Sequence, residues 1–328
     1  MRAYFVRITK PGTNDVLALY TSFQPDGSTN GAALQFEFDI PAYAYGDPAG
    51  NPYLKLSGVN YTDIRQASNL NGADITVYGG MAKGLPLANP QQAGVLFRGI
   101  VFQAWGNWQG NQTSLEMICI AAPPSSTSFG TNDSPVNLAY HWTKGQPMAQ
   151  AVKQALQIAF PSAAISGSYS SDLIYPEDQP FAYNTLGQFC RYLKDTSKAI
   201  IPATNYIGAQ ITQNPQGFLL FDGTQPPTEK QINFLDLIGQ PTWIDAGTMQ
   251  FRAVLRSDLK VGDVVKMPEH ANVQISGSNF SSFRDVTAFQ GSFMIKSIRH
   301  LGNSRQNSAE AWVSIIDTYS TTPAKTTS

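Results

Sequence analysis

The chain has 328 residues and a formal net charge of −1 at pH 7, with 42% apolar and only 14% charged residues. The length predicts two or three domains, and the charged fraction lies well below the roughly 25% of an average soluble domain. A near-neutral chain is not expected to bind nucleic acid through a broad basic face. A surface rich in Gln, Asn, Ser and Thr instead favours contacts with other protein subunits, because few charges must be desolvated on docking.

Targeting and membrane signals are not found in the sequence. The opening stretch MRAYFVRITKPG carries Arg7 inside what would be an apolar core, so it does not resemble a signal peptide. No run approaches the roughly 18 apolar residues that a spanning helix needs, and stable membrane insertion is not expected. Cys119 and Cys190 are too few for a disulfide framework. We therefore expect the chain to fold in a cytoplasm.

Residues 1–122 are predicted to form strands joined by turns. In the third strand apolar side chains alternate from Leu34 to Ile40, which is typical of a strand with one buried face. Gly106-Asn107 and Gly110-Asn111 are expected to supply the positive φ angles of hairpin turns. The predicted strands are RAYFVRIT, DVLALYTSF, AALQFEFDIPAYAY, ADITVYGG, GVLFRGIVFQAWGN and TSLEMICIAA.

The middle of the chain changes character. Residues 123–139, beginning PPSSTSFGTNDSP, are predicted to be a linker, and residues 140–227 a small α+β insert domain. Pro147 suits the first position of a helix over PMAQAVKQALQIAF. In TLGQFCRYLKD the apolar residues recur at helical spacing from Leu186 to Leu193. AIIPATN and GFLLFDG are predicted to be short strands.

A β pattern returns over residues 228–319, after the boundary sequence PPTEK, and residues 320–328 are predicted to be a flexible tail. This last region echoes the first. Each has a strand that opens after a glycine turn, in GADITVYGG and GDVVKMP, and then a long polar loop. Each continues with Phe-x-Gly and a strand ending on Gly-Asn, in FRGIVFQAWGN and FQGSFMIKSIRHLGN. The Phe-x-Gly to Gly-Asn spacing differs by four residues, so duplication and shared turn chemistry both remain open.

Three stretches together resemble the baseplate hub proteins of tailed bacteriophages. ADITVYGGMAKGLPLANPQQAGVLFRGIVFQAWGNWQG (73–110) is similar to the first tube-like barrel of that family, and FLDLIGQPTWIDAGTMQFRAVLRSDLKVGDVVKMP (234–268) to the start of the second. YHWTKGQPMAQAVKQAL (140–156) lies where the family keeps an inserted domain. The resemblance implies a mainly β fold, with tube-like β-barrel domains over 1–122 and 228–319 flanking the α+β insert.

The resemblance also implies a function. Hubs of this family are homotrimers whose six barrels form a pseudo-sixfold ring, which joins a tail tube to a threefold spike and surrounds the DNA channel. The implied partners are further copies of the chain, the tail tube protein, a spike protein, and other baseplate and tape-measure proteins. The implied location is the virion, after assembly in the host cytoplasm. Because the chain ends soon after its last predicted strand, we expect the spike to be a separate protein.

Residues for catalysis, cofactor binding or metal binding are not evident in the sequence. His141, His270 and His300 are widely spaced and have no His-Glu-x-x-His pattern, and we expect the last two to lie on the surface. Cys119 and Cys190 lie on apolar faces typical of core residues. GGMAKG lacks the spacing of a phosphate-binding loop. We therefore expect a structural protein and not an enzyme, with no cofactor.

Residues at subunit contacts are the expected functional residues. The loops 81–94 and 269–285 occupy equivalent places in the two predicted barrels. Aromatic side chains are enriched at interfaces. The candidate interface residues are Trp105, Trp108, Trp243, Met81, Leu85, Leu87, Phe280 and Phe283.

Two alternative functions remain open. Trp105 and Trp108, together with Trp142 and Trp243, could stack on sugars in a monomeric carbohydrate-binding surface module. A cell-wall hydrolase is the less favoured alternative, because it requires a convergent pair of carboxylates. Glu177 and Asp178, between two prolines, fit a solvated turn better than an active site.

Overall fold

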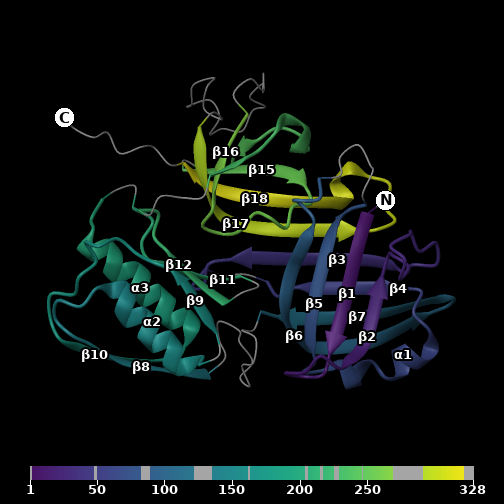
Figure 1. Ribbon diagram of the computed structural model, residues 1–328, viewed down its shortest axis with the longest axis horizontal. Helices are drawn as coiled ribbons and strands as arrows, with labels where there is room; N and C mark the ends of the chain where they lie inside the picture. Colours follow the sequence, from purple (N-terminus) through teal and green to yellow (C-terminus); the bar gives the residue numbers. More distant parts are fainter. Residues whose placement is uncertain are drawn as a thin grey trace.

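The structure of the chain is a computed structural model. It contains a β unit at each end of the chain and an α+β insert between them, each with its own hydrophobic core (Figure 1). We call these the N-terminal unit (2–121), the insert (135–224) and the C-terminal unit (229–320). The prediction of a mainly β chain with an α+β insert is confirmed. The described residues are 2–47, 50–82, 89–121, 135–161, 163–203, 206–214, 217–224, 229–245, 247–268 and 291–320.

The N-terminal unit consists of two strand layers that cross (Figure 1). The long strand β6 belongs to both layers, because its first half pairs with β5 and its second half pairs only with β7. A bulge between Val101 and Gln103 marks the change, as expected where a strand bends from one layer to the next. The strands are β1 (Arg2–Thr9), β2 (Val16–Thr21), β3 (Gln35–Tyr43), β4 (Tyr53–Ser57), β5 (Asp74–Met81), β6 (Gly94–Gln109) and β7 (Gln112–Ile120).

Two short helices precede β5 and pack against β6. They are α1 (Tyr61–Arg65), which contacts β6 and β7, and η1 (Ala67–Leu70). Asn60 caps α1, because its side chain accepts a hydrogen bond from the amide of Asp63 at 2.8 Å. The sequence did not predict β4 or these helices.

The insert contains two helices and two small sheets. Its elements are β8 (Pro135–Trp142), α2 (Met148–Ala159), β9 (Ala164–Gly167), β10 (Gln179–Thr185), α3 (Leu186–Ile200), β11 (Gln210–Asn214) and β12 (Gly217–Phe221). Strand β8 pairs with β10 and begins inside the stretch predicted as linker. Both predicted helices and the strand in GFLLFDG are present. Pro147 is the N-cap of α2 and not its first residue.

One predicted strand of the insert is wrong. The sequence AIIPATN begins inside α3, which continues to Ile200. The helix extends because its buried face continues past Leu193 to Ser197, which is fully buried. The Ser197 hydroxyl also accepts a hydrogen bond from the amide of Ala209 at 2.7 Å, and so ties the helix end to the chain before β11.

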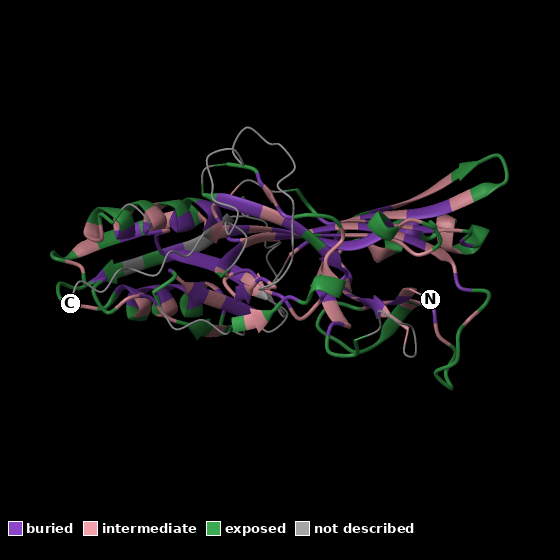
Figure 2. Cartoon of the chain, turned by 90° about the horizontal axis from the view of Figure 1, so that it is seen from above, coloured by how far each residue is buried: buried purple, intermediate pink, exposed green. Residues whose placement is uncertain are grey.

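The C-terminal unit contains β13 (Glu229–Gln231), η2 (Phe234–Asp236), β14 (Thr242–Trp243), β15 (Thr248–Val254), β16 (Val264–Lys266), β17 (Ser292–Asn303), η4 (Ala309–Ala311) and β18 (Trp312–Ser320). Its core is packed from β14 to β18 and includes the aromatic pair Trp243 and Phe293, with ring centroids 6.2 Å apart. Figure 2 shows buried residues along the middle of the molecule and exposed residues on the outer helices, loops and hairpin tips.

One continuous sheet joins the two β units. Its strand order is β14-β15-β18-β17-β3-β4-β7-β6-β5-β1-β2, and β16 and β13 extend it from β17. The junction is the antiparallel pair β17–β3, in which Ser297 to Asn303 face Tyr43 to Glu37. Figure 1 shows β17 and β3 side by side although about 260 residues separate them in the chain.

The predicted echo between the two units is present in their strand order. The N-terminal unit has the order β3-β4-β7-β6-β5-β1, and the C-terminal unit has β14-β15-β18-β17-β16-β13. Every neighbouring pair is antiparallel in both series, apart from the last pair of the second, β16–β13, which is parallel. The long strands β6 and β17 also share a bulge, after Val101 in β6 and after Ile295 in β17.

The hydrogen bonds beside the two bulges match. The amide of Gly72 donates to the oxygen of Val101 at 2.8 Å, and the amide of Gly262 donates to the oxygen of Ile295 at 2.9 Å. Val101 and Ile295 each donate in return to the residue after that glycine. Both glycines have positive φ, 80° and 92°, which glycine adopts without steric cost. The two units therefore repeat one local design.

The predicted Gly-Asn turns differ from the structure in one case. Gly110 has φ 58° and lies in the β6–β7 turn, as expected. Gly106-Asn107 instead lies inside β6. A side chain at Gly106 would collide with Ile64 of α1, because an added Cβ would lie 2.7 Å from the Ile64 oxygen. Gly106 is therefore required for helix packing and not for a turn.

Candidate assembly surfaces

An eight-strand sheet crosses the whole molecule and includes strands from both β units. We use this name for β14-β15-β18-β17-β3-β4-β7 together with the second half of β6, residues 103–109. Its one internal boundary between units is the β17–β3 junction. Its two ends are β14 and the second half of β6, and in the described part of the chain no further strand pairs beyond either end.

The β17–β3 junction shows how the two units bind each other. On its outer face Arg299 Nε donates to Asp39 Oδ1 at 2.7 Å. On its core face the rings of Phe38 and Trp312 meet edge to face, with centroids 5.1 Å apart. The Trp312 indole donates to the Gly80 oxygen at 3.0 Å and so reaches into the N-terminal unit. The junction combines strand pairing, an ion pair and a shared aromatic core.

The second half of β6 has an edge that β5 does not cover. The amide of Ala104 points to this edge, because it donates to Asn71 Oδ1 at 2.7 Å and not to β7. Aromatic side chains are exposed beside it. Trp108 is 62% exposed, and its ring meets that of Tyr61, itself 56% exposed, edge to face at 5.1 Å.

The opposite edge begins before β14. Residues 237–243 run antiparallel to β15, with a bridge between Leu237 and Ala253 and regular pairing at β14. Gly239, with φ 82°, interrupts this edge strand. Ile244 follows it with 44% of its surface exposed.

Exposed large apolar side chains gather at the two ends of the eight-strand sheet and on β2, the last strand of the whole sheet. They concentrate on β2, the outermost strand of the N-terminal unit, on and beside the second half of β6, on η2, and just after β14. Exposed apolar groups of this kind mark interaction sites. In the described ranges the exposed large apolar residues of these regions are Val16, Leu17, Leu19, Tyr61, Phe102, Trp108, Phe234, Leu235 and Ile244.

The candidate interface residues from the sequence lie partly at these edges. Trp105 and Trp108 belong to the second half of β6, and Trp105 is partly exposed. Trp243 belongs to β14, but its side chain is buried in the C-terminal core. Met81 ends β5 and is half-buried against the N-terminal core. Leu85, Leu87, Phe280 and Phe283 lie outside the described residues, as do residues 83–88 of the first loop and the whole of the second.

The outer face of the eight-strand sheet is polar. Carboxylates on it accept hydrogen bonds from neighbouring side chains, including Gln250 to Asp317 and Tyr53 to Glu116, both at 2.8 Å. Burial opposes ionisation of Glu116, but hydrogen bonds from Tyr53 and Ser114 outweigh it and hold its pKa below the usual value. A polar groove of about 660 Å³ lies over β3, β4 and the β6–β7 hairpin. The face is thus neither strongly basic nor apolar.

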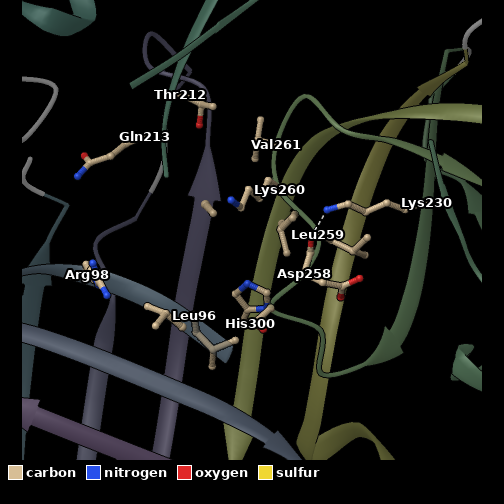
Figure 3. A pocket seen from close by; sticks show the side chains of 14 residues that line it. Leu96, Arg98, Thr212, Gln213, Lys230, Asp258, Leu259, Lys260, Val261 and His300 are labelled. Atoms are coloured by element: carbon tan, nitrogen blue, oxygen red, sulfur yellow. Dashed lines mark hydrogen bonds between the residues drawn. The ribbon is translucent and has the colours of Figure 1, made fainter. Parts of the chain in front are cut away.

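A cleft of about 410 Å³ lies where the two β units and the insert meet (Figure 3). Leu96 and Arg98 line it from β6, Thr212 from the insert and His300 from β17. Lys230 also lines it, but its ammonium donates to the main-chain oxygen of Asp258, as Figure 3 shows, and to Asp263. These contacts tie segments of the C-terminal unit together beside the cleft.

The expectation of a surface position for His300 is wrong. His300 is 3% exposed, and its Nδ1 lies 2.8 Å from the Ser314 hydroxyl. Burial lowers its pKa to about 4. It is buried because β3 pairs with this part of β17, with Ile40 facing His300. Without β3 this edge of β17 would be exposed. His270 lies outside the described residues, and His141 is exposed.

The cysteines, the possible metal ligands and the other tryptophans of the described ranges form no candidate site. Cys119 and Cys190 are buried as predicted. In those ranges no three His, Cys, Asp or Glu side chains are grouped so that they could hold a metal ion. Trp142 and Trp243 are buried and cannot stack on a sugar. The helices described here include none that is long and apolar enough to span a membrane.

Comparison with known proteins gives structural neighbours but no family. No protein-family model and no curated protein matches the chain. A tail protein from Neisseria meningitidis is similar in structure at 10% identity and a TM-score of 0.47, with 97% of this chain and 96% of that chain covered. The 43 kDa tail protein of prophage MuSo2 from Shewanella oneidensis is similar at 7% identity and a TM-score of 0.48, over 97% and 96%.

A chain of the half-lidded Francisella PdpA–VgrG complex is also similar, at 8% identity and a TM-score of 0.48. Here 97% of this chain aligns with 57% of the longer one.

Proposed function

We propose that the protein is a structural component of a phage tail hub. In this proposal three copies form a ring of six β units, which joins a sixfold tail tube to a threefold spike and surrounds the DNA channel. The observation that carries it is the repeated strand order, β3-β4-β7-β6-β5 and β14-β15-β18-β17-β16, within one continuous sheet. A chain with two alike units can present sixfold contacts on one side of a trimer and threefold contacts on the other.

Ring formation follows from the two ends of the eight-strand sheet. The ends differ, because one is β14 and the other the second half of β6. A contact between unlike surfaces repeats from copy to copy and closes into a ring when the rotation fits. Exposed apolar side chains at both ends, such as Trp108 and Ile244, favour burial by a neighbour.

The polar outer face of the sheet fits the wall of a DNA channel. DNA is bound tightly where Lys and Arg neutralise its phosphates. On this face Arg299 is paired with Asp39, and Arg252 with Glu310 at 2.7 Å. Such a wall would let DNA pass without sequence-specific binding. The tube protein, a spike protein and other baseplate and tape-measure proteins are the proposed partners, and the virion is the proposed location.

Native mass spectrometry and size-exclusion chromatography with light scattering test this function. We expect a stable species at three times the 35.7 kDa of one chain and rings in negative-stain micrographs. A monomer at micromolar concentration would contradict the hub, and glycan binding by that monomer would favour a carbohydrate-binding module. Loss of turbidity in a peptidoglycan suspension would instead indicate a hydrolase.

A further inference from the structure

We infer that ring closure uses one particular strand pair: the second half of β6 in one copy pairs antiparallel with residues 240–243 of the next copy, with Asn107 opposite Thr242. The inference rests on the proposed ring and specifies its interface. The occupant of each edge is a second copy of this chain, because the chain already contains the same contact once, as the β17–β3 junction.

The bulges fix which residues of the two units correspond. In the N-terminal unit Gln103, the first paired residue after the bulge, faces Ile118, which in turn faces Tyr53. In the C-terminal unit Ser297, the first paired residue after the bulge, faces Asp317, which in turn faces Gln250. Counting along β6 and β17 from these positions makes Asn107 the counterpart of Leu301.

The edge strands correspond in the same way. Asp39 of β3 faces Tyr53 of β4, and Thr242 of β14 faces Gln250 of β15. Thr242 is therefore the counterpart of Asp39. In the β17–β3 junction Leu301 faces Asp39. Replacing each residue by its counterpart places Asn107 opposite Thr242 of the next copy.

Backbone directions agree with this register independently. Backbone groups point to alternate edges of a strand from one residue to the next. The Ala104 amide points away from β7. Gly106 lies two residues further along β6, so its backbone N–H and C=O point to the same open edge. The Ile244 amide points toward β15, since it donates to the Thr248 oxygen at 3.0 Å. The backbone N–H and C=O of the preceding residue, Trp243, therefore point away from β15. The register pairs Gly106 with Trp243, and both direct their backbone groups at the interface.

The side chains brought together also suit contact. Asn107 and Thr242 project from the outer face, as their counterparts Leu301 and Asp39 do. On the same face the register sets Trp105 opposite Ile244, which is 44% exposed in the single chain. Asn71 already accepts the hydrogen bond of the Ala104 amide, so the new ladder would begin at Gly106. The next residue that faces this edge, Trp108, lies opposite Pro241, whose oxygen accepts a hydrogen bond but which has no N–H to donate.

Cysteine cross-linking of the full chain tests the register. Asn107 and Thr242 would form a non-hydrogen-bonded antiparallel pair, whose Cα atoms lie about 4.5 Å apart, within the range that a disulfide spans. We expect mild oxidation of an equimolar mixture of Asn107→Cys and Thr242→Cys chains to give covalent dimers, and the double variant to give covalent trimers. Native Cys119 and Cys190 are buried and should not react.

Three controls accompany this experiment. Asp39→Cys with Leu301→Cys should close a disulfide within one chain and reports the efficiency of a true pair. Gln109→Cys with Thr242→Cys is displaced by two residues and should cross-link poorly. Asn107→Cys alone should remain monomeric on a non-reducing gel.

The possible outcomes separate this inference from the proposed function. If native mass shows a trimer but the 107–242 pair fails to cross-link while the 39–301 pair succeeds, the register is wrong and the hub stands. If Asn107→Cys links to itself, like edges meet and the inference is overturned. If the wild-type chain is a monomer, the hub and this inference both fall.

Discussion

Arg299 of β17 and Asp39 of β3 form an ion pair across the junction of the two β units, with Arg299 Nε 2.7 Å from Asp39 Oδ1. The hydrogen bond to Asp39 raises the pKa of Arg299, although partial burial opposes the rise. The pair is nevertheless solvated, since the Arg299 side chain is 56% exposed. Exposed ion pairs contribute little to stability. We expect Arg299→Ala to lower the free energy of unfolding by less than about 1 kcal/mol in urea titrations, and a much larger loss would show that this pair holds the units together.

The close contact between Gly302 and Phe38 should matter more. A Cβ at Gly302 would lie 2.1 Å from the Phe38 ring, which is itself packed against Trp312. We expect Gly302→Ala to destabilise the chain by about 1–3 kcal/mol, because the ring must leave its position. Gly31→Ala is the matched control, since no atom lies within 4 Å of its added Cβ. Equal unfolding midpoints for the two variants would contradict this packing.

His300 predicts a pH-dependent stability. Its folded pKa, about 4, lies below the ordinary 6.5, so the unfolded chain binds the proton more readily. The stabilisation is therefore complete above pH 6.5 and is lost as pH falls toward 4, by about 3 kcal/mol in total. We expect His300→Gln, which can still bond Ser314, to flatten this dependence in urea titrations between pH 7 and 4.5. His141→Gln, at an exposed position, should keep the wild-type slope, and an unchanged slope in His300→Gln would contradict the assignment.

The Arg256 side chain is the centre of a buried ion cluster. It is 6% exposed and donates to Asp258 at 2.7 Å and to Asp236 at 3.2 Å. Asp236 also accepts from Gln92 of the N-terminal unit at 2.8 Å. Removing the guanidinium leaves two carboxylates without their cation, which typically costs about 3–5 kcal/mol. We expect Arg256→Ala to lower the thermal unfolding midpoint far more than Arg65→Ala at an exposed position, and similar midpoints would exclude a stabilising cluster.

Trp105 and Trp108 are predicted to stabilise the assembly and not the single chain. Trp108 is largely exposed, so its removal should leave monomer unfolding nearly unchanged. We expect the Trp105→Ala, Trp108→Ala double variant to dissociate at least tenfold more readily in analytical ultracentrifugation. Ile158→Ala, at an exposed position on α2 of the insert, is the control. If the double variant dissociates no more readily than the wild type, neither residue is an interface anchor.

Local patterns in the sequence determined much of this protein. Alternating apolar residues located β3, helical spacing located α2 and α3, and glycine turns located the starts of β5 and β16. Each signal depends on residues within one strand, one helix or one turn. The two β regions, the insert between them and their faint repeat are therefore recognisable from the sequence.

Only the tertiary structure decided how these parts are joined. Pairing of β17 with β3 brings together residues about 260 positions apart, and local spacing carries no information on such a contact. The same pairing buries His300 and makes Gly302 a packing position. It also leaves the second half of β6 and the outer side of β14 as the ends of the eight-strand sheet. The strand edges that can pair with a neighbouring copy are those that no strand of the same chain already covers.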